Sequence, residues 1–362
     1  AQLYHGRYDE GDGKITRADF VLGCNGDRGS LTTAVEYRKE EEVMARDRPY
    51  SAYPQGQWHP TRGWTTVSQW GVINLPTALG GNRVLNAGAD WRNINNFHAQ
   101  DCDTGAVSPT TPPACRYTNG AGATADKSNT NLQTHLRTPL ESRALFVDGI
   151  FDINDHVRFR GNMMYSQRDA ERQVAGYPFQ SAAFGISMAA NSYYNPVGTH
   201  HGFATPQAVN FWRRTWEIPR VDKPTSTTWR FAAGLEGSFE VGERLFDWDA
   251  SYLYNNNKVA QENYGNLNLA RVAQAVGPSF LNAAGQVQCG TAAAPIPLAN
   301  CVPWNPYIPF GRAGDGGLTD NKALTDFLFQ ALNSSGETET TVFGANLSGS
   351  LFTLPGGGLG FA

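Results

Sequence analysis

The chain has 362 residues and a mass of 39.4 kDa, with 29 lysine and arginine residues against 33 aspartate and glutamate residues. The resulting formal net charge of −4 gives no electrostatic reason to expect nucleic-acid binding. Charged residues make up only 17% of the chain and aromatic residues 12%, which argues against intrinsic disorder. No run of about 18 apolar residues is present, which excludes a transmembrane helix. A transmembrane β-barrel is not excluded, because its strands alternate apolar and polar residues and so contain no long apolar run.

The main signal along the chain is alternation of apolar and polar residues with period two. Within 229–239, for example, Trp229, Phe231 and Leu235 alternate with polar or small residues such as Arg230 and Glu236. Such alternation predicts strands with one apolar face, and a dozen or more residues is long for a soluble strand. The predicted strands are 2–10, 14–24, 30–45, 140–152, 156–174, 226–240, 246–258, 339–354 and a ninth beginning at 358.

The connections between these strands alternate between short and long. Short turns rich in Gly, Asn and Asp are typical of β-hairpins, whereas long loops are rare in compact soluble domains. A transmembrane barrel combines short periplasmic turns with long extracellular loops, so the pattern predicts an antiparallel outer-membrane β-barrel. The short turns lie near 27, 154, 243 and 356, and the long loops span roughly 47–139, 175–225 and 259–338.

The long loops contain structure of their own. Leu324, Phe327, Leu328 and Leu332 follow Thr319 at helical spacing, which predicts a helix with a threonine cap. A second short helix is predicted near 269–276. The loops also hold seven tryptophans, which either shape a binding mouth or pack the loops on each other. These tryptophans are Trp58, Trp64, Trp70, Trp91, Trp212, Trp216 and Trp304.

The five cysteines indicate an oxidising compartment. Cys102 and Cys115 enclose one short loop and Cys289 and Cys301 another, while Cys24 is left over. No tight C-x-x-C pair of the kind that binds zinc is present. The spacing favours two local disulfides, Cys102–Cys115 and Cys289–Cys301, and free or differently paired thiols are the alternative.

No catalytic constellation and no cofactor motif is found, so we expect a binding and transport protein and not an enzyme. The adjacent His200 and His201 lack further metal ligands at typical spacing. The acidic stretches 9–13 and 315–317 do not follow the EF-hand pattern and are interpreted first as turns.

A basic cluster in the second long loop provides the candidate substrate-binding residues Arg213, Arg214 and Trp216, with Arg220 nearby. Its arginines have two interpretations. They contact an anionic ligand or lipopolysaccharide phosphate at the outer face, or they form ion pairs with Glu217 and other loop carboxylates.

Several stretches together resemble the barrel of TonB-dependent outer-membrane receptors, in the group with long loops. No single stretch is specific, but their order and spacing fit across nearly the whole chain. The stretches are Asn25-Gly26-Asp27-Arg28-Gly29-Ser30, Asn191-Ser192-Tyr193-Tyr194-Asn195-Pro196-Val197-Gly198, Phe211-Trp212-Arg213-Arg214-Thr215-Trp216-Glu217-Ile218-Pro219-Arg220, Trp229-Arg230-Phe231-Ala232-Ala233-Gly234-Leu235-Glu236-Gly237, Asp247-Trp248-Asp249 with Tyr252, Val302-Pro303-Trp304-Asn305-Pro306 and Phe310-Gly311.

The resemblance implies a plug domain inside a 22-stranded barrel, located in the bacterial outer membrane and surrounded by lipid and lipopolysaccharide. It also implies uptake of a scarce nutrient, driven through the plug by a TonB-type energy-coupling complex. Residues 1–362 would then be a partial barrel of about nine strands, lacking the plug and the C-terminal strands. Arg158, Arg160 and Arg230, on the polar strand face, would lie in the lumen against water or the plug.

Two other classes of protein remain as alternatives. A passive porin-like barrel would be complete, with an even strand number and no plug. A secreted soluble β-protein, such as a glycan-binding module or a hydrolase, would cover its apolar strand faces with a second sheet.

Overall fold

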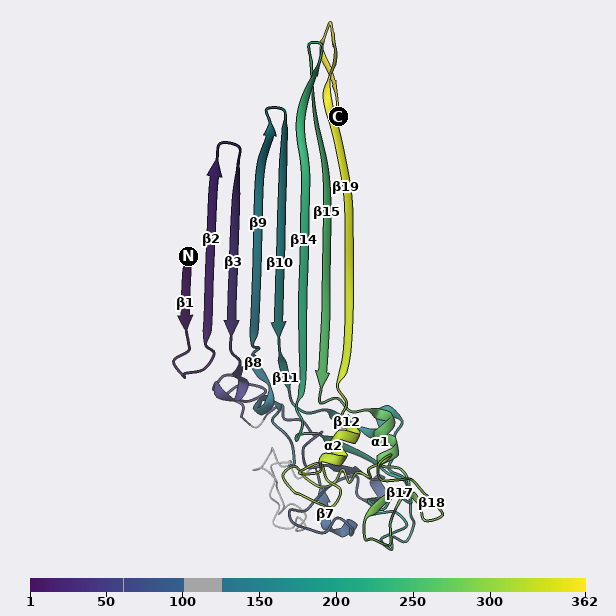
Figure 1. The fold of residues 1–362 in the computed structure, drawn as a ribbon. Coiled ribbons are helices and arrows are strands. Elements are labelled where there is room, and N and C mark those ends of the chain that lie inside the picture. The colour runs from purple at the N-terminus through teal and green to yellow at the C-terminus, as the bar shows by residue number, and fades with distance from the viewer. Residues whose placement is uncertain (61, 101–125) are drawn as a thin grey trace.

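A single antiparallel sheet dominates the computed structural model, which describes residues 1–60, 62–100 and 126–362. Nine strands lie side by side in chain order, with a body of folded loops at one end (Figure 1). This arrangement confirms the predicted antiparallel all-β fold. The strands are β1 (Gln2–Gly6), β2 (Ile15–Gly26), β3 (Gly29–Glu40), β9 (Leu140–Asn154), β10 (Val157–Ala170), β14 (Arg220–Val241), β15 (Arg244–Tyr264), β19 (Leu332–Leu354) and β20 (Gly357–Phe361).

The strand ends near the loops differ from the predicted ones. β14, β15 and β19 begin or end six or seven residues further toward the loops than the alternation indicated. The added segments are mostly polar, with only scattered apolar residues such as Val221, Val259 and Leu332, so they carry no sustained period-two signal although the backbone ladder continues through them. The predicted strands 2–10 and 30–45 were too long, and 156–174 divides into β10 and the short β11 (Arg172–Val174), which pairs with β14.

The four hairpin turns are tight and lie together at the end of the sheet opposite the loops (Figure 1). Each leaves two residues between paired strands, as the sequence indicated. Gly242 in the β14–β15 turn has a φ of 66°, a conformation that favours glycine. The turn residues are Asp27-Arg28, Asp155-His156, Gly242-Glu243 and Pro355-Gly356.

One face of the sheet is apolar and largely exposed. Cross-strand partners share a face, and the register joins one row of large apolar residues across five strands. Tyr165 and Trp229 in this row are in ring contact at 4.4 Å. Another ring contact on the same face, Phe239 with Phe246 at 5.3 Å, lies near the hairpin turns. The row consists of Phe20, Val35, Leu145, Tyr165 and Trp229.

The opposite face is polar. Arg158 pairs with Asp152 at 2.6 Å and approaches Glu236 at 3.9 Å. Asn346 donates to both oxygens of Asp249, at 3.0 and 3.1 Å. These residues form one row of the register, Asp152–Arg158–Glu236–Asp249–Asn346. Alternation along each strand therefore separates an apolar side from a charged side.

The loop body consists of the segments that follow β3, β10 and β15. Its five-stranded sheet has the order β12-β13-β5-β6-β7, so strands from the first and second long loops pair with each other. The elements of the loop body are β4 (Val43–Met44), η1 (Ala45–Asp47), β5 (Val72–Asn74), η2 (Thr77–Leu79), β6 (Asn82–Leu85), η3 (Ile94–Asn96), β7 (Phe97–Ala99), η6 (Thr130–Gln133), β8 (His135–Arg137), β12 (Pro178–Gln180), η7 (Ser181–Phe184), β13 (Asn210–Arg214), α1 (Leu269–Ala275), β16 (Ser279–Leu281), β17 (Val287–Thr291), β18 (Ala294–Pro295) and α2 (Lys322–Leu328).

The hydrophobic core of the described chain lies in this loop body. Trp91, Phe211, Trp304 and Tyr307 are completely buried there, whereas Glu40 is the one buried residue in the nine main strands. Phe211 contacts Trp304 edge to face at 5.6 Å, which joins the second loop to the third. For Trp91 and Trp304, the packing interpretation of the loop tryptophans is therefore correct.

Both predicted loop helices are present, but α2 has a different cap. Asn321 caps it by accepting a hydrogen bond from the Leu324 amide at 3.1 Å. Thr319 lies two residues before this cap, and its hydroxyl accepts from the Gly311 amide at 3.0 Å instead. Leu332 is not part of the helix and begins β19. No helix in the described ranges has the length and apolar character needed to span a membrane.

Candidate functional site

A fixed aromatic cluster forms where the first and second long loops meet. Trp91 is completely buried and makes edge contacts with His201 at 5.1 Å, Tyr194 at 5.3 Å and Tyr193 at 6.0 Å. Trp91 follows β6, whereas the other three rings precede β13. Because such edge-to-face contacts stabilise a structure beyond the effect of burying the rings, the cluster stabilises the contact between the two loops.

The second loop reaches this cluster through a tight turn at Asn195. The buried Asn195 amide donates to the carbonyls of Ala189 and Gln207, at 3.0 and 2.8 Å, and its oxygen accepts from the Val197 amide at 3.1 Å. A side chain longer than hydrogen at Gly198 would meet the Ala190 carbonyl at 2.4 Å. These contacts explain the Asn-Pro-Val-Gly sequence as local structure.

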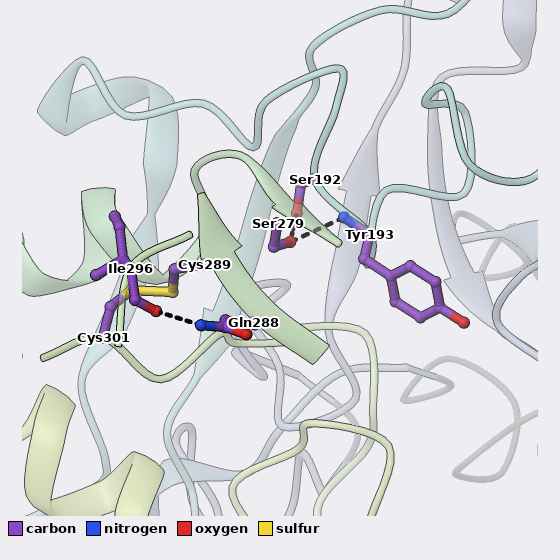
Figure 2. Close-up of a disulfide and its surroundings, with 7 residues drawn as sticks. All are labelled: Ser192, Tyr193, Ser279, Gln288, Cys289, Ile296 and Cys301. Atoms are coloured by element: carbon purple, nitrogen blue, oxygen red, sulfur yellow. Dashed lines mark hydrogen bonds between the residues drawn. A yellow bond between two sulfur atoms is a disulfide. The ribbon is translucent and has the colours of Figure 1, made fainter. Parts of the chain in front are cut away.

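The Cys289–Cys301 disulfide braces the cluster from the third loop (Figure 2). Cys289 on β17 pairs in register with Ser279 on β16. The Ser279 hydroxyl accepts a hydrogen bond from the Tyr193 amide at 2.9 Å, and Figure 2 shows the Tyr193 ring pointing away from the disulfide. All three long loops therefore hold the cluster.

A surface pocket of about 440 Å³ opens beside the cluster, and this pocket is our candidate functional site. Its volume is within the range of about 300–1,000 Å³ that is typical of ligand sites. The Arg92 guanidinium lies 4.8 Å from the Trp91 ring and pairs with Asp90 at 3.0 Å. The pocket is lined by Arg92, Asn93, Ile94, Asn95, Pro196, His201, Gly202 and Phe203.

His201 is oriented by a backbone contact. Its Nε2 lies 2.6 Å from the Tyr193 carbonyl oxygen, which can only accept, so Nε2 carries the proton in a neutral ring. Nδ1 of that tautomer is an acceptor. Burial lowers the pKa of His201, and the neighbouring His200 and Arg92 act in the same direction. The imidazole is therefore neutral at pH 7.

The candidate residues from the sequence lie inside the loop body and not in this pocket. Arg213 is fully buried and pairs with Glu217 at 2.6 Å, as the ion-pair interpretation proposed. Arg214 is also buried and donates to the carbonyls of Val67 and Gly176, at 3.0 and 2.9 Å. Trp216 is buried as well. These arginines join loop segments, and substrate binding by the three residues stays a prediction.

Burial has a clear electrostatic effect on Arg214. It lowers the pKa of the guanidinium to about 10, and the nearby Arg220 contributes to the same shift. Hydrogen bonds of charged groups each contribute about 1.5–3 kcal/mol, so the two bonds to the Val67 and Gly176 carbonyls offset part of the cost of burying this guanidinium.

The acidic stretches weighed as calcium sites are paired with arginines. Arg48 contacts both carboxylate oxygens of Asp12, at 2.6 and 3.1 Å, and hydrogen bonding to Arg48 lowers the pKa of Asp12. Arg312 pairs with Asp315 at 3.0 Å. Within the described ranges, no group of three or more His, Cys, Asp or Glu side chains could hold a metal ion.

One of the two predicted disulfides is confirmed. Cys289 and Cys301 form the predicted disulfide. Cys102 and Cys115 lie outside the described residues, so their pairing stays a prediction. Cys24 is a free, exposed cysteine on β2.

Sequence reasoning did not single out Arg92, Asn95 or Phe203, and it weighed His201 only as a metal ligand. The two sides of the pocket are about a hundred residues apart in the chain, and neither side carries a recognisable motif. The nearest signal was the concentration of aromatic residues in the long loops. Only pairing between those loops brings the lining residues together.

Comparisons with known proteins found similar solved structures but no match by sequence. No protein-family model and no curated protein sequence matches the chain. Solved structures that resemble it include BauA, the ferric preacinetobactin receptor from Acinetobacter baumannii, at 10% identity and a TM-score of 0.30, covering 99% of this chain and 37% of that chain. The ferric-catecholate import receptor Fiu from E. coli K12, in its open form, has 14% identity and a TM-score of 0.25, covering 93% and 40%. The chain thus spans about two fifths of the length of these structures.

Proposed function

We propose that this chain is part of a nutrient-uptake receptor of the bacterial outer membrane. The two-faced sheet is the observation that carries the proposal. Trp229 and Phe239 are the outermost aromatic residues on the apolar face of β14 and are ten residues apart, which corresponds to about 33 Å along a strand. At the tilt of 35–45° usual in such barrels, this length crosses about 25 Å of bilayer, the height of their apolar band.

The position of the loop body sets the proposed orientation. The folded loops lie at one end of the sheet and the tight hairpins at the other (Figure 1). A disulfide such as Cys289–Cys301 persists in an oxidising compartment. We therefore place the loop body outside the cell and the hairpin turns in the periplasm.

The polar face would line the lumen of the barrel. The charged row from Asp152 to Asn346, together with Arg160 and Arg230, would contact water and the plug domain of the same receptor. Release of the nutrient would depend on a TonB-type energy-coupling complex acting through that plug. The chemistry is binding and gating without covalent catalysis.

The first experiment tests membrane residence and energy dependence in one strain. Cells that lack the gene are compared with wild type for growth across limiting nutrients, and the protein is followed by membrane fractionation and by gel mobility before and after heating. We expect heat-dependent mobility in the outer-membrane fraction and a growth defect on at least one nutrient. The same defect is expected when the energy-coupling complex is deleted.

Two outcomes would contradict this proposal. Recovery of the protein in a soluble fraction without detergent would support a secreted β-protein. Uptake that continues without the energy-coupling complex would support a passive barrel.

A further inference from the structure

We infer that the pocket beside the Trp91 cluster binds an uncharged saccharide unit of the transported nutrient. This inference rests on the proposed function and names the substrate class of that receptor. Three properties of the pocket support it: its charge, its mixture of hydrogen-bonding groups and its rigidity.

The pocket provides no net charge to an ionic ligand. The Arg92 guanidinium is matched by Asp90 at 3.0 Å, and the His201 ring is neutral at pH 7. The deeper arginines, Arg213 and Arg214, are buried against Glu217 and backbone carbonyls. An anionic nutrient would need unmatched cations at the surface, because charged groups are recognised by opposite charge.

The hydrogen-bonding groups suit hydroxyls, which both donate and accept. The Arg92 guanidinium provides donors, the Asn95 side chain provides a donor and an acceptor, and His201 Nδ1 is an acceptor. Phe203 and Ile94 add apolar surface to the same pocket. The face of an aromatic ring carries partial negative charge, which attracts the weakly positive C–H groups of a sugar ring.

The pocket is preorganised. Trp91 behind it is completely buried, His201 is fixed by the Tyr193 carbonyl, and Tyr193 is tied through Ser279 to the strand that carries Cys289. Side chains that are already ordered lose little entropy on binding, so a modest set of hydrogen bonds suffices for affinity. Rigid walls also favour a ligand whose hydroxyls have fixed directions.

The experiment uses the intact natural protein purified in detergent and titration calorimetry. The neutral probes are maltotriose, cellotriose and mannotriose, and the charged probe of matched size is a trimer of galacturonate. A capped tripeptide provides the competing class of ligand. Each probe is raised to about 10 mM, a concentration that saturates even a millimolar site.

We expect at least one neutral trisaccharide to bind, and to bind more tightly than the galacturonate trimer or the peptide. Arg92→Ala and Phe203→Ala should each weaken that binding about tenfold, the loss expected for one charged hydrogen bond or one aromatic contact. Arg46→Ala is the matched control, because Arg46, like Arg92, pairs with a nearby aspartate, here Asp47, but does not line the pocket. Near-ultraviolet circular dichroism shows whether each variant remains folded.

Absence of binding by all three neutral sugars would overturn the inference, as would tighter binding of the charged trimer or the peptide. Binding that Arg92→Ala and Phe203→Ala leave unchanged in folded protein would overturn it too. Each of these results would leave outer-membrane residence and energy-dependent growth intact, so failure of the substrate class is distinguishable from failure of the proposed function.

Discussion

The main sheet and the loop body differ in where their apolar residues lie: the sheet exposes them and the loop body buries them. In the sheet, Phe231, Leu235 and Phe343 are exposed, with 79% of Phe343 accessible, and the backbone ladders hold the strands together. In the loop body, Trp91, Trp304 and similar residues form a buried core of the kind found in soluble domains. The comparison teaches that one chain contains two regions of different kinds: a sheet whose apolar face is left exposed, and a loop body that buries its own apolar residues.

The largest expected effect comes from the core of the loop body. Trp304→Ala removes a completely buried indole that contacts Phe211 and Phe179. Such truncations cost about 3–5 kcal/mol, and we expect the loss in the loop body alone. Hydrogen exchange should report it as faster exchange in β5 and β13 with unchanged β14 and β15. Trp58→Ala, at a tryptophan that is 83% exposed, is the control, and faster exchange throughout the sheet would contradict the division into two regions.

A second prediction concerns the two faces of the sheet. Ala232 and Ala233 are neighbours on β14 with side chains on opposite faces, and Ala233 shares the apolar face with Phe231 and Leu235. Arginine in the lipid-facing middle of a barrel strand costs about 2–4 kcal/mol. We therefore expect Ala233→Arg to reduce the heat-modifiable, membrane-inserted fraction and Ala232→Arg to change it little. Equal effects of the two variants would show that the apolar face is not in lipid.

The disulfide should matter for the loop body but not for the sheet. Replacing both Cys289 and Cys301 with alanine releases a connection across 12 residues, worth about 3 kcal/mol in the chain-entropy model. Thermal melting followed by near-ultraviolet circular dichroism should show a lower midpoint for the loop aromatic residues. Cys24→Ala is the matched control, since this cysteine is free and exposed. An unchanged midpoint in the double variant would show that the disulfide does not stabilise the aromatic cluster.

The smallest effect concerns pH. The pKa of His201 in the folded loop body is lowered from its ordinary value of 6.5 by burial, with His200 and Arg92 acting in the same direction and Asp90 and the Tyr193 carbonyl opposing it. Between the two pKa values the unfolded chain binds more protons, so stability falls as pH drops below about 6.5. His201→Gln should reduce this dependence in melting curves of the loop aromatic residues. If the His201→Gln variant shows a pH dependence of stability of the same size, other titratable groups cause that dependence.

Much of the sheet could be predicted because its signal is local. Alternation along a single strand depends on which side chains face an apolar surrounding, and short Gly- and Asp-containing turns mark the hairpins. For this reason the nine strands, their antiparallel order and the tight turns followed from the residues alone. The ends of β14, β15 and β19 near the loops did not follow, because apolar residues are only scattered there while backbone pairing continues.

The interior of the loops depended on contacts that are distant in sequence. The sequence identified Arg213 and Arg214 as a basic cluster, but only the folded loops determine that Glu217 and two carbonyls surround them. The pocket likewise requires residues 92–95 and 196–203 to meet through the pairing of β13 with β5. The sequence by itself therefore determined which residues alternate and turn. The tertiary structure decided which loops meet and which charges remain accessible, because burial and pairing are properties of the assembled contacts.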